Sequence, residues 1–352
     1  MSDSYDAILL VSFGGPNQPD DVLPFLENVL RGKNVPRERM LEVAEHYQHF
    51  GGVSPINEQN QELIAALRTE LDSQGITLPI YWGNRNWHPL LTDTLREMRD
   101  AGVRRALAIF TSAYSSYSGC RQYRENITDA RAAVGPDAPE VDKVRAYFNH
   151  PGFVEACVAR LEEALAAIPV ERRAETLLVF TAHSIPLAMA TNCRYVVQLE
   201  DVARLCSERL RHPHYRLVYQ SRSGPPTQPW LEPDVLDFLR QVKQEGRFHD
   251  VVVAPIGFIS DHMEVMYDLD TEAHHLCQEL GLNMVRAATV GTHPRFVRGL
   301  RELIVERMQG GERLFIGQLG PNPDVCPVDC CLSGRPTMGR PAASQPAPTP
   351  GG

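Results

Sequence analysis

The sequence predicts an α/β protein built from two similar halves, each a parallel sheet covered by helices on both faces. Short apolar runs alternate with amphipathic helical stretches, and the predicted strands are apolar throughout, as in parallel sheets. Three segments also recur in the same order: ILLVSFGGP resembles LLVFTAHSIP, YWGNRN resembles YQSRSG, and ALAIFTSAYSS resembles VVVAPIGFISD. We therefore expect two similar domains facing each other over a cleft, with ligands at the carboxyl ends of the strands.

The expected elements follow in order. Strands are predicted at 7–13, 78–82, 106–111, 177–181, 215–220, 251–255 and 283–287. Helical patterns between them include 56–73, 91–101, 123–134, 151–168, 195–211 and 233–245. The domain boundary falls before Pro151, which gives domains 1–150 and 151–317. A cysteine-bearing segment, 318–332, follows, and the segment 333–352, rich in Pro, Gly and Ala, is expected to be a disordered tail.

Composition limits the classes of function. A formal net charge of −9 argues against nucleic acid as the main partner, because phosphate binding needs a basic surface. No apolar run reaches the roughly 20 residues of a membrane span. The first apolar stretch has no basic region before it, so we expect a strand rather than a signal peptide, and hence a cytoplasmic protein. In that compartment the eight cysteines are expected to be thiols or metal ligands rather than disulfides. We also expect a monomer, because nothing in the sequence indicates an obligate dimer.

Two strand ends carry side chains that suit metal and proton chemistry. His183 follows one apolar run, and Glu264, Asp268 and Glu272 recur every four residues after another. On an α-helix this spacing drifts by about 40° per step, so a locally widened turn would be needed to align the carboxylates, and such bulges favour functional sites. An imidazole facing carboxylates can take protons from a bound ligand and deliver a hard divalent cation. A structural histidine and a solvated acidic face are the alternatives.

The first half offers candidates for binding an acidic, flat, aromatic ligand. GGVSPINEQNQELIAAL predicts a helix with Ser54 as N-cap and Pro55 at the first helical position. Such a helix start attracts carboxylates or phosphates, and Arg31 lies close in sequence. The run TSAYSSYSGCRQYRENI adds Tyr114, Tyr117, Arg121, Tyr123 and Arg124. FGGP, which begins at Phe13, lacks the GxGxxG pattern of a dinucleotide site.

The sequence CPVDCC places Cys326, Cys330 and Cys331 within six residues. Three clustered cysteines indicate ligation of a soft metal with a fourth ligand from elsewhere, for which Cys157 is the candidate. A reactive tail and a chance cluster remain alternatives. The other cysteines, Cys120, Cys193, Cys206 and Cys277, are expected to be ordinary half-buried residues.

Six motifs together resemble the ferrochelatase family, in its bacterial coproporphyrin III type: LLVSFGGP, FGGVSPIN, YWGNRNWHP, TAHSIP, YQSRSGPPTQPWLEPD and PIGFISDHMEVMYDLDTEA. The resemblance runs from about residue 5 to 331. It implies two Rossmann-like domains with a porphyrin cleft between them. It also implies insertion of Fe2+ into a porphyrin dianion in haem biosynthesis.

Within that resemblance, His183 in TAHSIP and Glu264 in SDHMEV match the inner metal-site pair of the family. Asp268 and Glu272 match its acidic path for metal or protons. Ser54 and Tyr123 match positions that bind the porphyrin propionates. Tyr47, in EHYQHFGG, lies in the same region of the sequence, as does Arg31.

The CPVDCC segment together with Cys157 resembles the 2Fe–2S site that a subset of the family carries. The chain departs from some coproporphyrin-type members at three positions. Phe13, at the porphyrin site, replaces a tyrosine that could ligate iron, and Leu30 and His46 stand where arginines occur. Propionate binding is therefore expected to differ in detail.

The resulting expectation is a ferrochelatase that acts on coproporphyrin III. This substrate is favoured because several basic or hydroxyl-bearing residues are available for propionates and no apolar membrane-docking segment is evident. A protoporphyrin IX ferrochelatase, a chelatase for another metal and tetrapyrrole, and a non-catalytic haem or tetrapyrrole carrier remain alternatives. A two-lobed periplasmic metal-binding protein would share the architecture but would need a signal peptide.

Overall fold

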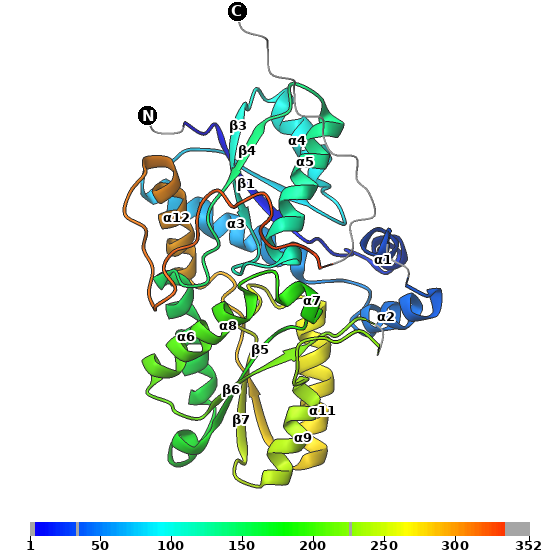
Figure 1. The fold of residues 1–352 in the computed structure, drawn as a ribbon, viewed down its shortest axis with the longest axis vertical. Coiled ribbons are helices and arrows are strands. Elements are labelled where there is room, and N and C mark those ends of the chain that lie inside the picture. The colour runs from blue at the N-terminus through cyan, green and yellow to red at the C-terminus, as the bar shows by residue number, and fades with distance from the viewer. Residues whose placement is uncertain (1–3, 33–34, 225–226, 335–352) are drawn as a thin grey trace, which may run out of the picture.

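The computed structural model describes residues 4–32, 35–224 and 227–334, and it contains two four-stranded parallel sheets. The strand orders are β2-β1-β3-β4 and β6-β5-β7-β8, which are the same arrangement used twice. Figure 1 shows one sheet in each lobe of the molecule, flanked by helices. The predicted α/β class with two similar halves is confirmed. The tail predicted at 333–352 lies, from residue 335 onward, outside the described residues.

The strands are β1 (Ala7–Ser12), β2 (Ile80–Asn84), β3 (Arg105–Phe110), β4 (Glu140–Lys143), β5 (Leu177–His183), β6 (Tyr215–Gln220), β7 (Asp250–Ala254) and β8 (Asn283–Arg286). The three repeated segments form β1 and β5, β2 and β6, and β3 and β7. Each pair occupies equivalent positions in the two sheets. Every residue of β1 and of β7 is buried, as expected of strands covered on both faces.

The helices of the first half are η1 (Pro19–Asp21), α1 (Val22–Leu30), α2 (Arg37–His49), α3 (Ile56–Ser73), α4 (Leu91–Asp100), η2 (Tyr117–Arg121) and α5 (Gln122–Val134). Those of the second half are α6 (Pro151–Ala166), η3 (Val170–Glu175), α7 (Leu187–Ala190), α8 (Tyr195–Leu210), α9 (Val235–Glu245), α10 (Met263–Val265), η4 (Met266–Ala273), α11 (His274–Leu280) and α12 (Pro294–Gln309). Both η2 and η4 are π-helices, which are wider than α-helices. No helix among the described residues is both long and apolar enough to cross a membrane.

The helix α12 joins the two halves. It packs against α6 and also against α3 of the first half. The buried Arg145 guanidinium forms a paired contact with Glu306, at 2.8 and 3.1 Å, and Arg301 Nε lies 3.2 Å from Glu70 Oε1. The boundary predicted at Pro151 coincides with the start of α6, but this packing crosses it.

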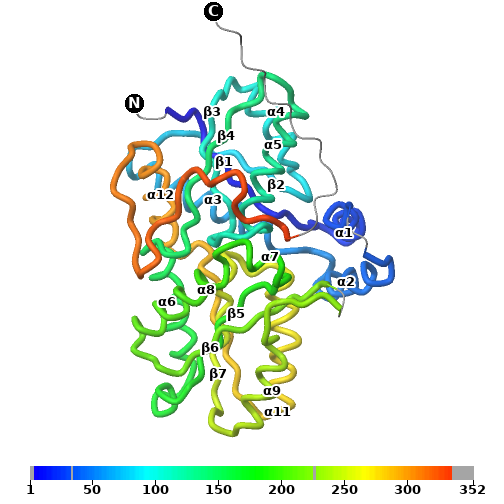
Figure 2. The backbone as a smooth tube through the Cα atoms, viewed as in Figure 1, coloured from blue at the N-terminus to red at the C-terminus, as the bar shows by residue number. Residues whose placement is uncertain are grey.

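The chain after α12 returns to the first half as an extended segment, residues 313–331, which we call the C-terminal strap. Asn149 Nδ2 donates to Gly320 O at 2.7 Å. Asn322 bridges the halves, since its Nδ2 donates to Ser115 Oγ at 2.8 Å and its Oδ1 accepts from Gln198 Nε2 at 3.4 Å. Figure 2 shows the strap, in orange and red, crossing the middle of the molecule.

Candidate active site between the two sheets

The centre of the site is a histidine–carboxylate pair at the carboxyl ends of neighbouring strands. His183 is the last residue of β5, and Glu264 follows β7, which pairs with β5. His183 Nε2 lies 3.8 Å from Glu264 Oε2, and the two side chains are 30% and 50% exposed. The sequence placed both residues at strand ends, and the structure brings them together.

The orientation of the imidazole leaves one nitrogen available. His183 Nδ1 contacts the carbonyl oxygen of Ser184, and a carbonyl oxygen can only accept a hydrogen bond. The Nδ1 atom therefore carries the hydrogen in the neutral ring, and Nε2 presents its lone pair toward Glu264. The Tyr195 hydroxyl donates to the His183 carbonyl oxygen at 3.1 Å and fixes the backbone there. His183 Nε2 can thus accept a proton or bind a metal ion.

The acidic residues lie on a short helical turn and on the widened helix that continues it. The short helix α10 carries Glu264, and its N-cap residue is His262, whose Nδ1 accepts from the Glu264 backbone N–H at 3.2 Å. The π-helix η4 follows and carries Asp268 and Glu272. Its wider winding offsets the drift that a four-residue spacing has on an α-helix. Glu264 and Glu272 both act electrostatically on Asp268, so the three carboxylates form one acidic ladder.

Asp268 has the most altered carboxyl group of the ladder. Burial and, to a smaller extent, the negative charges of Glu264 and Glu272 raise its pKa to about 7, against hydrogen bonds from Ser221 and Gln220 that lower it. Gln220 Nε2 donates to Asp268 Oδ2 at 3.2 Å, and Ser221 Oγ donates to the same oxygen. Near neutral pH this carboxyl group can therefore both take up and release a proton.

Aromatic and cationic groups form the opposite side, at the end of β1. Phe13 is 36% exposed, and its ring centroid lies 6.2 Å from that of Phe25. The Arg85 guanidinium lies 5.6 Å from the Phe13 ring centroid and 4.6 Å from that of Tyr123. Arg85 Nε donates to Asn126 Oδ1 at 2.7 Å. Arg85 was not among the predicted site residues, although the YWGNRN motif contains it.

The predicted propionate-binding residues occupy different environments. Ser54 is buried under Gly15, where an added Cβ would lie 2.6 Å from Ser54 Cβ. The N-cap prediction was wrong: α3 begins at Ile56, with Pro55 as its cap residue and no side-chain capping bond. Proline lacks the backbone N–H that continues a hydrogen-bond ladder, so the boundary moves by one residue.

The remaining two candidates lie on α1 and α2. Tyr47 is buried, with its ring centroid 5.8 Å from that of Phe25, and burial together with the Glu264 charge raises its pKa. The Tyr47 side chain is therefore shielded from open solvent. Arg31 is exposed at the end of α1, where its Nη2 donates to Asn28 Oδ1 at 2.6 Å.

Two contacts connect the halves across the site. The His46 ring on α2 stacks on Tyr267 of η4, with ring centroids 3.7 Å apart and an angle of 9° between the planes. Gln59 of α3 exchanges two hydrogen bonds with the Asp261 backbone, at 2.8 and 3.3 Å. His46 thus covers one side of the acidic ladder.

Comparison with known proteins identifies the family of this chain. A family model described as Ferrochelatase matches residues 5–308. The chain belongs to the ferrochelatase family. It is 59% identical over 329 residues to a ferrochelatase of Rhodopirellula baltica, with 93% of each chain covered. It is 53% identical over 365 residues to the coproporphyrin III ferrochelatase of Streptomyces coelicolor, covering 97% of this chain and 96% of the relative.

Solved structures support the fold. SirB from Bacillus subtilis, in a structure with Fe3+, matches with a TM-score of 0.54 at 12% identity, covering 87% of this chain and 97% of SirB. At this identity the likeness concerns the fold alone. The ferrochelatase fold of this chain therefore shares its two-sheet arrangement with that protein.

The cysteines expected of an iron–sulfur member of the family lie on two separate elements, α6 and the strap. Cys157, on α6, is buried in the core, whereas Cys326 and Cys330 on the strap are partly exposed. No group of three metal-ligating side chains stands in metal-binding geometry within residues 4–32, 35–224 and 227–334. The set of Cys157, Cys326, Cys330 and Cys331 therefore stays a prediction.

Proposed function

We propose that this protein is a ferrochelatase that inserts Fe2+ into coproporphyrin III during haem biosynthesis. The observation that carries the proposal is the free Nε2 atom of His183, 3.8 Å from Glu264 at one end of the acidic ladder. Family membership and relatives named coproporphyrin III ferrochelatases support it. The cytoplasmic location and the monomeric state expected from the sequence are part of the same proposal.

The chemistry requires the removal of two pyrrole protons. A neutral porphyrin carries two N–H groups, and Fe2+ replaces both hydrogens, so one metal ion enters and two protons leave. His183 Nε2 accepts one of these protons, because Nδ1 is already committed to the Ser184 carbonyl oxygen. Glu264 lies within reach of the same nitrogen and accepts the other proton or passes the metal ion.

Asp268 and Glu272, the rest of the acidic ladder, transfer Fe2+ and protons between the His183–Glu264 pair and the solvent. Carboxylate oxygens bind Fe2+ as hard ligands and, without a complete coordination shell, release it again. Asp268, with a pKa raised to about 7, changes protonation state close to neutral pH. It therefore suits the outward transfer of protons released at His183.

The opposite side holds the macrocycle. Phe13 presents an apolar ring to a flat ligand, and the Arg85 guanidinium beside it supplies a positive charge for a propionate. Burial lowers the Arg85 pKa, which shows that the cation is poorly solvated and gains from an anionic partner. Ser54, Tyr123, Tyr47 and Arg31 remain proposed contacts of the porphyrin rim.

The test is anaerobic incubation of the purified protein with Fe2+ and coproporphyrin III, followed through the Soret and Q bands, with protoporphyrin IX in parallel. The proposal expects catalytic formation of iron coproporphyrin, faster than formation of iron protoporphyrin. Faster turnover of protoporphyrin IX would overturn the substrate. Stoichiometric binding without turnover would overturn the reaction and make the protein a carrier.

We also propose that the strap holds a 2Fe–2S cluster. The chemistry of the donors fits, because Cys326, Cys330 and Cys331 lie within six residues on the strap and Arg124 Nη2, a cation suited to a thiolate, lies 3.1 Å from Cys330 Sγ. Cys157, the predicted fourth ligand, is buried on α6. When bound, such a cluster supplies a one-electron redox centre and a cross-link of the strap. We assign it no step in metal insertion.

A further inference from the structure

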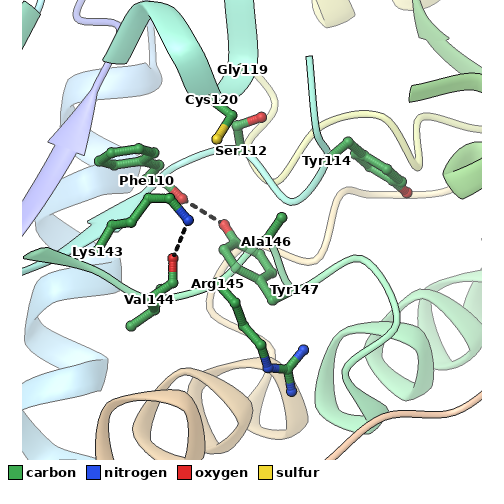
Figure 3. Close-up of a pocket in the computed structure, with 10 residues that line it drawn as sticks. All are labelled: Phe110, Ser112, Tyr114, Gly119, Cys120, Lys143, Val144, Arg145, Ala146 and Tyr147. Atoms are coloured by element: carbon green, nitrogen blue, oxygen red, sulfur yellow. Dashed lines mark hydrogen bonds between the residues drawn. The ribbon is translucent and has the colours of Figure 1, made fainter. Parts of the chain in front are cut away.

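The connection between β7 and α10, residues 255–262, is tied to the first half of the molecule at both ends. At its start, the hydroxyl of the buried Tyr114 donates to the Ile256 carbonyl oxygen at 2.9 Å. Figure 3 shows this tyrosine at the edge of a pocket, with its hydroxyl pointing away from Lys143. At its end, the connection meets α3. Because Glu264 lies two residues beyond the connection, both ties act on the segment that carries the metal-site carboxylate.

The tie to α3 is made by the side-chain amide of Gln59. Its Oε1 atom accepts from the Asp261 backbone N–H at 2.8 Å, and its Nε2 atom donates to the Asp261 carbonyl oxygen at 3.3 Å. A glutamine amide carries both an acceptor oxygen and donor hydrogens, so one side chain can bind both peptide groups of a single residue. Two bonds to the same residue fix its orientation relative to α3 as well as its distance.

The Asp261 side chain is held from the opposite direction, within the second half. Arg286 Nη1 donates to Asp261 Oδ1 at 2.7 Å, and the Thr289 backbone N–H donates to the same oxygen at 3.4 Å. Arg286 is the last residue of β8, which pairs with β7. Asp261 is therefore fixed to the second sheet through its carboxylate and to α3 through its backbone. A shift of α3 relative to the second sheet would strain these bonds.

The same turn of α3 also holds the side of the site that is proposed to bind the macrocycle. Asn57, two residues before Gln59, is buried, and its Nδ2 atom donates to the Gly15 carbonyl oxygen at 2.7 Å. Gly15 lies in the turn after β1, two residues beyond Phe13. The first turn of α3 thus binds the turn that carries Phe13 through one amide and the Asp261 backbone through the other.

From these contacts we infer that Gln59 is a positioning residue for the metal site. By tying the Asp261 backbone to α3, it sets where Glu264 lies relative to the half that holds the porphyrin. Gln59 takes up no proton and binds no metal ion itself, and it acts through Glu264. The inference rests on the proposed function and deepens it, because a carboxylate on one half can serve a macrocycle held by the other only if the two halves keep a fixed register.

The first experiment measures iron insertion by Gln59→Met, which keeps the length of the side chain and removes both bonds. Gln61→Met is the matched control, because Gln61 is exposed on the same helix. A misplacement of about 1 Å can cost about 10²-fold in rate, so we expect kcat of Gln59→Met to fall by about 10–10²-fold with little change in KM for the porphyrin. In a Glu264→Gln background the same change should cost nothing further, since its route of action is already lost. Losses that multiply in the double variant would overturn the inference.

A second measurement separates this inference from the proposed reaction. Co2+ is titrated into the full-length protein without porphyrin, its visible absorption reports binding, and His183→Ala identifies the signal that belongs to the His183–Glu264 pair. Loss of a group that orients a metal ligand costs about 10–100-fold in affinity, so Gln59→Met should bind Co2+ at least about tenfold more weakly than the wild type and Gln61→Met. Equal Co2+ affinity in all three would overturn the inference. A wild type that binds Co2+ at the pair but never turns over would overturn the proposed reaction, and the Co2+ comparison would still decide the role of Gln59.

Discussion

The two π-helices found among the described residues provide the most instructive comparison within the molecule. One, η2, follows β3, and the other, η4, lies beyond β7, the equivalent strand of the second sheet. The first ends in Cys120 and Arg121, whereas the second contains Asp268 and Glu272. The same backbone device thus carries thiols beside cations in one half and carboxylates in the other. The widened turn fixes where the side chains lie, and the residue types decide which kind of charged group the turn can bind.

A similar contrast exists at the ends of β1 and β5. In the repeated segments, Phe13 occupies the position of His183, so β1 is followed by an apolar ring and β5 ends in an imidazole. We infer that one half of the repeat holds the macrocycle while the other performs the proton and metal chemistry. The following predictions test this division.

The largest effect is expected from His183→Ala. Removal of one positioned acid–base group costs about 10²–10⁴-fold, so kcat for iron insertion should fall by that factor while porphyrin binding, followed by fluorescence quenching, changes little. Phe13→Ala is the matched variant at the equivalent position. It should mainly raise KM for porphyrin. Comparable losses of kcat in both variants would contradict the division of labour.

Glu264→Gln keeps the size of the side chain and removes its charge. We expect kcat to fall by about 10²-fold, because the amide cannot take the second proton or bind Fe2+ as a carboxylate does. Asp270→Asn is the control on the adjoining π-helix η4, since Asp270 is paired with Arg286. Steady-state assays at saturating Fe2+ should leave this control within a factor of a few of the wild type.

Arg85→Met tests the porphyrin-holding side. Hydrogen bonds to charged groups contribute about 1.5–3 kcal/mol, so loss of a propionate contact should raise KM for coproporphyrin about tenfold with a smaller change in kcat. Arg96→Met, which removes only an exposed pair with Asp93, should leave both constants unchanged. An unchanged KM in Arg85→Met would remove this guanidinium from the binding site.

The smallest effect concerns stability. Asp268 has a folded pKa of about 7 against an ordinary value of 3.8, so the folded state keeps its proton longer than the unfolded chain does. Its stabilising contribution is present below about pH 4 and is lost as the pH rises through 7. The unfolding temperature of Asp268→Asn should therefore rise relative to that of the wild type as the pH increases from 5 to 8, by on the order of 2–4 °C. Thermal unfolding of both proteins, followed by circular dichroism at pH 5 and at pH 8, measures this change. An equal difference in unfolding temperature at the two pH values would contradict the raised pKa.

The sequence predicted the repeated sheets and the metal pair for a clear physical reason. His183 and Glu264 both follow apolar runs, and the carboxyl ends of neighbouring parallel strands meet at one edge. The strand β4 was not predicted, because Glu140–Lys143 is a short edge segment with little apolar pattern. The local sequence pattern cannot reveal a strand such as β4, because the strand forms through hydrogen bonds with its neighbour β3 rather than through its own composition.

The other misses depend on contacts between distant segments. Arg85 gained its place from the approach of Phe13 and Tyr123, which belong to different elements. The contact of Arg121 with the Val328 and Cys330 carbonyl oxygens depends in the same way on the path of the strap, which only the folded chain shows. Spacing within the sequence carries no information on such long-range pairing.

The position of the C-terminal strap has a consequence for the order of synthesis. The eight strands of the described residues all precede the strap in the chain, yet Asn322 joins Ser115 to Gln198 across the halves and Leu314 accepts a hydrogen bond from the buried Arg145. Both sheets can therefore pair their strands before the strap is added, and the strap contributes its contacts after those of α12. A chain cut short just after α12 would keep every one of these strands and lose only this last fastening.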